Sequence, residues 1–115
     1  MTKKKEIFRV LNKLAVPCSI IGRELLECAI EYIMERGRTN FTRELYPYLS
    51  RTFDMSKSAI NRSLNVAIHK CMNESEFETL NDIFGNVYCN TYNLTAQSFI
   101  YGVVSYLKLQ EETEV

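Results

Sequence analysis

The chain is poor in the residues from which most active sites and metal sites are built. Its 115 residues include a single histidine, His69, and only four glycines, which form no glycine-rich phosphate loop. No cysteine or carboxylate stands at metal-ligand spacing from His69, and no serine lies in a nucleophile elbow. We therefore predict no enzymatic activity, no metal, no cofactor and no small-molecule substrate.

The cysteines are scattered and include no CxxC pair: Cys18, Cys28, Cys71 and Cys89. This pattern favours reduced, mostly buried thiols over a disulfide framework or a metal site. The basic start MTKKKEIF is not followed by the continuous apolar segment of a signal peptide, and no apolar run is long enough to span a bilayer. We therefore expect a cytoplasmic protein with no membrane partner.

The charges are unevenly distributed along the chain, although the net charge is zero. Residues 1–70 hold 13 Lys and Arg against 7 Asp and Glu, a balance of +6, whereas residues 71–115 hold 1 against 7, a balance of −6. Because phosphate binding needs local cations rather than a basic total, the first 70 residues are suited to an anionic partner. With 46% hydrophobic and 24% charged residues, the chain has the composition and length of one globular domain.

Apolar residues recur at helical spacing over most of the chain and predict an all-α fold of about six helices. The predicted helical segments are about 4–15, about 19–36, a pair of helices within 46–72, 75–84 and about 96–110. Pro17 ends the first segment, and the mixed segment 86–94 is either a loop or a short extended piece.

Local signals mark the ends of several predicted helices. The second helix carries one core stripe, made of Ile21, Leu25, Ala29 and Ile33. Gly37 after it suits the left-handed position that ends a helix. The sequence Ser75-Glu76-Phe77-Glu78 is a capping box that opens a helix closing at Gly85, and Thr95 caps the last helix.

Residues 45–69 have the pattern of a central helix-turn-helix, two short helices around a tight turn. Pro47 suits the first turn of the first helix, and Asp54 or Ser56 caps the second helix, at about 56–72. At roughly 100° per residue, the second helix has one inward stripe, formed by Ile60, Leu64, Ala67, Ile68 and Cys71. This arrangement is typical of a DNA-reading unit.

The opposite face of this second helix holds side chains that can read base edges in the major groove. Arginine favours guanine, and asparagine favours adenine. The predicted base contacts are Ser58, Asn61, Arg62 and Asn65, and the predicted phosphate contacts are Arg43, Arg51, Lys57 and His69. For His69, the other reading is an ordinary exposed helix residue.

A set of short motifs runs along most of the chain. The motifs are VPxxIxG from Val16 to Gly22, Ala29-Ile30, LYP at 45–47, Phe53, Ser58, Arg62, Ala67-Ile68, Phe84-Gly85, SFI at 98–100 and LKL at 107–109. In their order and nearly unbroken spacing, over about residues 10 to 110, they resemble the C-terminal effector domain of the stage-zero sporulation protein A family. These proteins are the response regulators that start endospore formation.

The resemblance implies a transcription regulator of sporulation that binds double-stranded DNA, with two effector domains meeting head to tail on tandem sites. No acidic cluster follows a strand, so we expect residues 1–115 to form a single effector-type domain with no receiver domain. For self-association, we expect the acidic C-terminal helix, at about 96–110, to meet the basic first half of a neighbouring copy.

The predicted reading helix departs from the family at three positions. Where the family carries a guanine-contacting Arg, a Glu and another Arg, this chain has Ala59, Asn61 and Asn65, whereas Ser58 and Arg62 are retained. The family's target sequence is therefore not carried over. The alternative function is a protein-interaction module of the same fold that pairs with or titrates another regulator. Such a module would present apolar residues on this face, which is polar and basic here.

Overall fold

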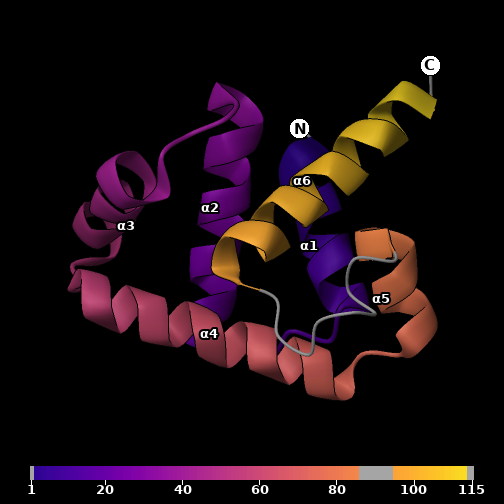
Figure 1. The fold of residues 1–115 in the computed structure, drawn as a ribbon, viewed down its shortest axis with the longest axis horizontal. Coiled ribbons are helices and arrows are strands. Elements are labelled where there is room, and N and C mark those ends of the chain that lie inside the picture. Colours follow the sequence, from indigo (N-terminus) through magenta and orange to yellow (C-terminus); the bar gives the residue numbers. More distant parts are fainter. Residues whose placement is uncertain (1, 86–94, 114–115) are drawn as a thin grey trace.

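The computed structural model describes residues 2–85 and 95–113, and these residues contain helices and no strand (Figure 1). The elements are α1 (Thr2–Lys13), α2 (Ile21–Arg36), the π-helical turn η1 (Phe41–Leu45), α3 (Tyr46–Phe53), α4 (Lys57–Glu74), α5 (Phe77–Phe84) and α6 (Ala96–Thr113). The predicted all-α fold is confirmed, and the mixed segment 86–94 lies outside the described residues.

Helix α2 is the centre of the molecule, because it packs against α1, α3, α4 and α6. Its inner residues are buried, namely Leu25, Leu26, Ala29, Ile30 and Ile33. Ile21, which the helical pattern assigned to the same stripe, is 41% exposed, so that assignment was wrong. Ile21 is the first residue of α2, and it is the next residue, Gly22, that lies against Ser63 and Ala67 of α4. Gly37 ends the helix with the predicted positive φ, +81°, and its N–H donates to the Ile33 carbonyl.

Helix α1 ends two residues earlier than predicted. Its last residue is Lys13, and Ala15 then turns with a left-handed φ of 59°. The N–H of Val16 donates to the carbonyl of Leu11 at 3.1 Å, which closes the turn. The chain therefore leaves the helix through this turn, before Pro17 acts on it.

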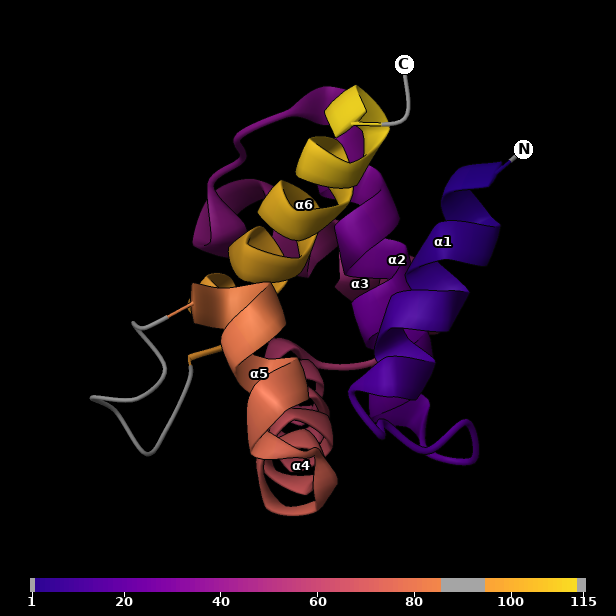
Figure 2. The same cartoon turned by 90° about the vertical axis from the view of Figure 1, so that its right-hand side faces the viewer.

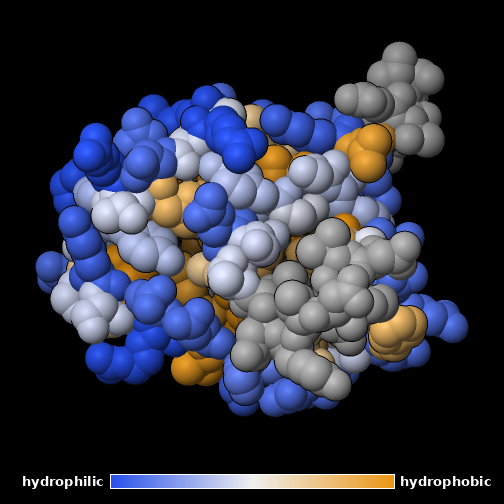
Figure 3. Space-filling model, in the orientation of Figure 1, coloured by the Kyte–Doolittle hydropathy of each residue, from blue (hydrophilic) through white to orange (hydrophobic). Residues whose placement is uncertain are grey.

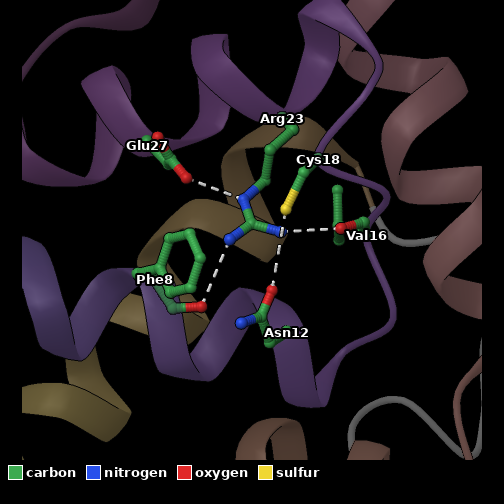
Figure 4. Close-up of polar contacts among 6 residues, drawn as sticks. All are labelled: Phe8, Asn12, Val16, Cys18, Arg23 and Glu27. Atoms are coloured by element: carbon green, nitrogen blue, oxygen red, sulfur yellow. Dashed lines mark hydrogen bonds and ion pairs between the residues drawn. The ribbon is translucent and has the colours of Figure 1, made fainter.

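The guanidinium group of Arg23 holds the loop between α1 and α2 in place (Figure 4). The side chain is 2% exposed and is the one buried charged side chain in the described part of the chain. Nε donates to Glu27 Oε2 at 2.7 Å, Nη1 to the Val16 carbonyl at 2.7 Å and Nη2 to the Phe8 carbonyl at 3.2 Å. The Arg23 Cζ also lies 4.9 Å from the centre of the Phe8 ring. These contacts offset the desolvation of a buried charge.

A glycine lets α2 and α4 cross closely. A Cβ placed on Gly22 would overlap the backbone carbonyl of Ser63 and stand 2.8 Å from the Ala67 Cβ. Only a residue without a side chain allows this distance between the two helix backbones. The position of α4 therefore depends on Gly22.

Helices α5 and α6 begin and end partly as predicted. Thr95 caps α6, because its Oγ1 accepts from the Ser98 N–H at 3.1 Å, and α5 ends before Gly85 at a φ of +68°. The predicted capping box at Ser75 was wrong. The N-cap of α5 is Glu76, without a side-chain cap, and the Ser75 hydroxyl donates instead to the carbonyl of Leu14.

The described cysteines differ in burial more than predicted. Cys18 is exposed, Cys28 is half-buried and Cys71 is buried. The prediction that most of the thiols are buried was therefore wrong for the described residues. Burial raises the pKa of the Cys71 thiol to about 11. Cys71 therefore stays protonated at neutral pH and acts as a core residue.

Candidate nucleic-acid interface

Helices α3 and α4 are joined by a short turn that Ser50 holds in shape. Asp54 ends α3 in the left-handed conformation, at φ 53° and ψ 51°, with its N–H donating to the Ser50 carbonyl. The Ser50 hydroxyl donates to the carbonyl of Met55. Ser56 then caps α4, because its Oγ accepts from the Ala59 N–H at 3.1 Å. Of the two residues predicted as the cap, Ser56 is therefore the one that acts.

Helix α4 runs along the lower edge of the molecule in Figure 1 and is seen nearly end-on at the bottom of Figure 2. Its predicted inner stripe is buried, namely Ile60, Leu64, Ala67, Ile68 and Cys71. The predicted base contacts Ser58, Asn61, Arg62 and Asn65 are all exposed on the remaining surface, and so is His69, a predicted phosphate contact. The helix therefore packs along one side and offers the other to a ligand.

The outer face of α4 is hollowed in its second half. The residues that line this hollow are Arg62, Asn65, Val66, His69, Lys70 and Asn73. Val66 is 46% exposed and is the only large apolar side chain exposed on α4, all of which is described. In Figure 3, hydrophilic atoms predominate along the lower left edge, where α4 begins in Figure 1, and one hydrophobic group interrupts them. The helical pattern of the sequence does not single out Val66, because the other residues on this face are polar or charged.

Asn61 is held by a residue of α3. The hydroxyl of Tyr46 donates to Asn61 Oδ1 at 3.4 Å. Burial raises the pKa of the Tyr46 hydroxyl above its ordinary value of 10.0, so this group stays a protonated donor at neutral pH. The Asn61 oxygen is engaged by Tyr46, and its amide N–H groups remain as donors to a ligand.

A second hollow extends the polar surface of α4 toward η1 and the start of α6. Its lining residues are Phe41, Thr42, Tyr46, Asn61, Asn65, Thr95, Ala96 and Gln97. Thr42 and Gln97 are exposed there, beside two of the predicted reading residues. Neither residue was predicted from the sequence, because both lie far from α4 along the chain and no local pattern places them beside it.

The cations near the start of α4 are not neutralised by carboxylates. Arg43, Arg51 and Lys57 are all exposed. Within residues 2–85 and 95–113, the one ion pair joins Arg23 to Glu27, with Nε and Oε2 2.7 Å apart. The three cations are therefore available to an anionic partner.

Other basic residues lie against aromatic rings or far from α4. The Arg36 Cζ lies 4.6 Å from the centre of the Tyr32 ring, and the Arg38 Cζ lies 5.3 Å from the centre of the Tyr101 ring. The lysines of Lys3–Lys5 belong to the first turns of α1. Figures 1 and 2 both show this end of α1 on the side of the molecule opposite α4. We therefore leave these lysines out of the proposed interface.

The described ranges contain neither a candidate metal site nor a membrane-spanning helix. No group of three or more His, Cys, Asp or Glu side chains there is placed to hold a metal ion. None of the helices in these ranges combines the length and the apolar character needed to cross a bilayer.

The protein is an all-α domain in which α4, capped by Ser56, exposes a polar and basic outer face. The model of the family described as "Sporulation initiation factor Spo0A C terminal" matches residues 7–107, nearly the whole chain, and the protein belongs to this family. The family is one of DNA-binding effector domains and not of enzymes. At the level of the family, the protein is therefore a DNA-binding transcription regulator linked to sporulation.

Proposed function

We propose that the protein recognises a specific double-stranded DNA sequence by placing α4 in the major groove, and that it regulates transcription from there. One observation carries this proposal. Helix α4 is packed along one side only, and its other side exposes Ser58, Arg62 and Asn65 together. The major groove admits an α-helix, and the N-terminal residues of a recognition helix contact base edges.

The four polar residues have different roles in this proposal. Arg62 donates to O6 and N7 of a guanine, and Asn65 pairs with an adenine through both atoms of its amide. Ser58 contacts a base edge near the start of the helix. Asn61 keeps both amide N–H groups as donors, whereas its oxygen already accepts a hydrogen bond from the Tyr46 hydroxyl. Asn61 therefore favours an acceptor such as guanine O6 or thymine O4 over a bidentate contact with adenine.

The charges around α4 favour an arrangement in which the first half of this helix enters the major groove of the DNA. Lys57 begins the helix, and Arg51 and Arg43 belong to the preceding elements, so all three are suited to phosphates. The carboxylates Glu74, Glu76 and Glu78 gather at the other end of the helix. The positive end of the helix dipole adds to the attraction at the first turn. His69, in the second half, serves as a further phosphate contact.

The alternative, a protein-interaction module without DNA reading, has less support on this surface. An interface core between proteins is depleted in charged residues and enriched in aromatic ones. The exposed face of α4 carries Arg62, His69 and three polar residues around the single apolar Val66. DNA binding therefore accounts for more of the side chains on this face.

Two substitutions on α4 test this proposal. With duplexes selected from a random library, Arg62→Ala should lose about 1–3 kcal/mol of binding free energy and relax the preference at one base position, because it removes a base contact. Lys57→Ala should instead weaken binding to all duplexes about equally and lower the salt dependence, because it removes a phosphate contact. Fluorescence anisotropy titrations at two salt concentrations measure both effects.

A matched variant controls for the lost charge. Arg9 is exposed on α1, so Arg9→Ala removes the same unit charge away from α4 and should leave selectivity unchanged. If Arg62→Ala binds the selected duplex as tightly as the parent does, α4 is not the reading helix.

We also propose that two copies meet head to tail on tandem sites. The predicted acidic surface at about 96–110 needs correction, because Lys108 is the only charged residue in that range. The acidic surface lies instead at the end of α4 and on α5, where Glu78 and Asp82 are exposed. Opposite charges near the two ends of α4 favour a basic end meeting the acidic end of a neighbour.

A further inference from the structure

We propose that Val66 contacts the 5-methyl group of a thymine and thereby selects the base at one position of the DNA target. The inference rests on the proposed function, since it requires α4 to lie in the major groove. It adds a specificity-determining residue that is apolar, in a helix whose other proposed base contacts are polar.

Folding gives no reason for valine at this position. The inner stripe of α4 is complete without it, and the Val66 side chain is 46% exposed. A β-branched residue is also less favourable in a helix than alanine or lysine, because it loses rotamer freedom. An exposed valine in the middle of an eighteen-residue helix therefore lowers stability relative to those residues. A ligand that covers the side chain would account for it.

The base edges of DNA offer one apolar group in the major groove. Thymine presents its C5-methyl group there, whereas guanine and adenine present the acceptor N7 together with O6 or an amino group. Packing Val66 against a purine edge would leave such a polar atom buried without a partner, which is costly. The valine methyl groups and the thymine methyl group instead bury apolar surface against each other.

The place of Val66 on the helix predicts which base it selects. Val66 follows Arg62 by four residues, so the two share the outer face and line the same hollow. Four residues correspond to about 6 Å along a helix axis, and one base-pair step is about 3.4 Å. The thymine should therefore lie about one or two base pairs from the guanine that Arg62 contacts.

Replacing thymine by deoxyuridine tests the inference, because deoxyuridine lacks only the methyl group. In the selected duplex, each thymine is replaced in turn, and binding is measured for the parent and for Val66→Ala. The parent should bind about fourfold more weakly when one particular thymine is replaced, as expected for one lost apolar carbon contact. Val66→Ala should bind the thymine and uracil duplexes equally, with the weaker affinity that the parent has for the uracil duplex.

Two controls keep the result interpretable. Leu109→Ala shortens another exposed apolar side chain, on α6, and should keep the fourfold ratio of the parent. Far-ultraviolet circular dichroism and a thermal melt should show that Val66→Ala is folded, since the residue contributes nothing to the core stripe.

The outcomes separate this inference from the proposed function. If the parent shows no uracil penalty, or if Val66→Ala keeps the penalty, while Arg62→Ala still loses selectivity, the thymine contact is overturned and the DNA-reading helix stands. If the parent selects no sequence and Arg62→Ala matches it, the proposed function fails, and this inference fails with it.

Discussion

At the scale of single residues, one buried charge connects the first two helices. Arg23 belongs to α2, but two of its three acceptors are carbonyl oxygens of α1 and of the following loop. Its remaining partner, Glu27, is 36% exposed. Removing the guanidinium would leave the buried Val16 carbonyl without the donor that it has in this structure, and Glu27 without its ion pair.

We predict that Arg23→Met lowers the free energy of unfolding by about 2–4 kcal/mol, because methionine fills the volume but donates no hydrogen bond. Urea denaturation followed by circular dichroism measures the change. Arg9→Met is the control, since this exposed residue of α1 should change stability by less than about 0.5 kcal/mol. An Arg23→Met protein as stable as the parent would show that the three bonds are not needed for folding.

At the scale of helices, α2 sets the position of α4. The two helices meet where Gly22 lies against Ser63 and Ala67. Ser63 and Ala67 flank the exposed residues of α4, so a displacement at this crossing would also move the proposed reading face. We therefore expect Gly22 to couple stability to the proposed DNA recognition.

We predict that Gly22→Ala lowers the free energy of unfolding by about 1–3 kcal/mol, because overpacking forces the helix backbones apart. It should also reduce sequence selectivity more than the stability loss alone explains. Thermal unfolding and duplex titrations of the same samples measure the two effects.

Gly37→Ala is the matched control. No atom lies within 4 Å of its added Cβ, so the positive φ of 81° should lower stability while selectivity is kept. Unchanged selectivity in Gly22→Ala would separate the crossing from recognition.

At the scale of the whole molecule, charge varies along the edge formed by α4. Unpaired cations lie near the start of this helix, and exposed carboxylates lie at its end and on α5. A neighbouring copy in the same orientation on DNA would bring a basic end to an acidic end. Attraction of this kind weakens as salt is added, since exposed charges are screened.

We predict cooperative binding to duplexes with two selected sites in tandem. Glu78→Gln combined with Asp82→Asn should reduce this cooperativity and leave the affinity for a single site almost unchanged, because the proposed arrangement turns these carboxylates toward the neighbour rather than toward the DNA. Footprinting on one-site and two-site duplexes provides the comparison. Glu35→Gln, an exposed substitution on α2, should keep the cooperativity of the parent. Equal affinity per site in the parent on both duplexes would remove the case for pairing.

The helices and their buried faces could be predicted because they depend on residues close together in the sequence. The stripe of α4 follows from apolar spacing within one helix, and the caps Ser56 and Thr95 each act on an N–H three residues later. The exposure of Arg62 and Asn65 was predictable for the same reason. Their contact with DNA remains a prediction.

Two of the differences arose where residues far apart in the sequence meet. Ser75 fits a capping box, but its hydroxyl bonds to Leu14, 61 positions earlier in the chain. In the same way, the bond from Tyr46 to Asn61 changes what Asn61 can offer a base. A helical pattern assigns side chains to faces, but it does not tell which partner from another helix occupies each one.

Because the two faces of α4 are separate, the sequence of its outer face can change during evolution while the core is kept. The outward residues Ser58, Arg62, Asn65 and Val66 are absent from the buried stripe, so each can change without opening a cavity in the core. Surface substitutions of this kind usually alter stability by less than about 0.5 kcal/mol. After a gene duplication, one copy could therefore acquire a different operator through these positions while keeping its architecture. A combinatorial library at the same four positions should contain mostly folded variants, from which new operator preferences can be selected.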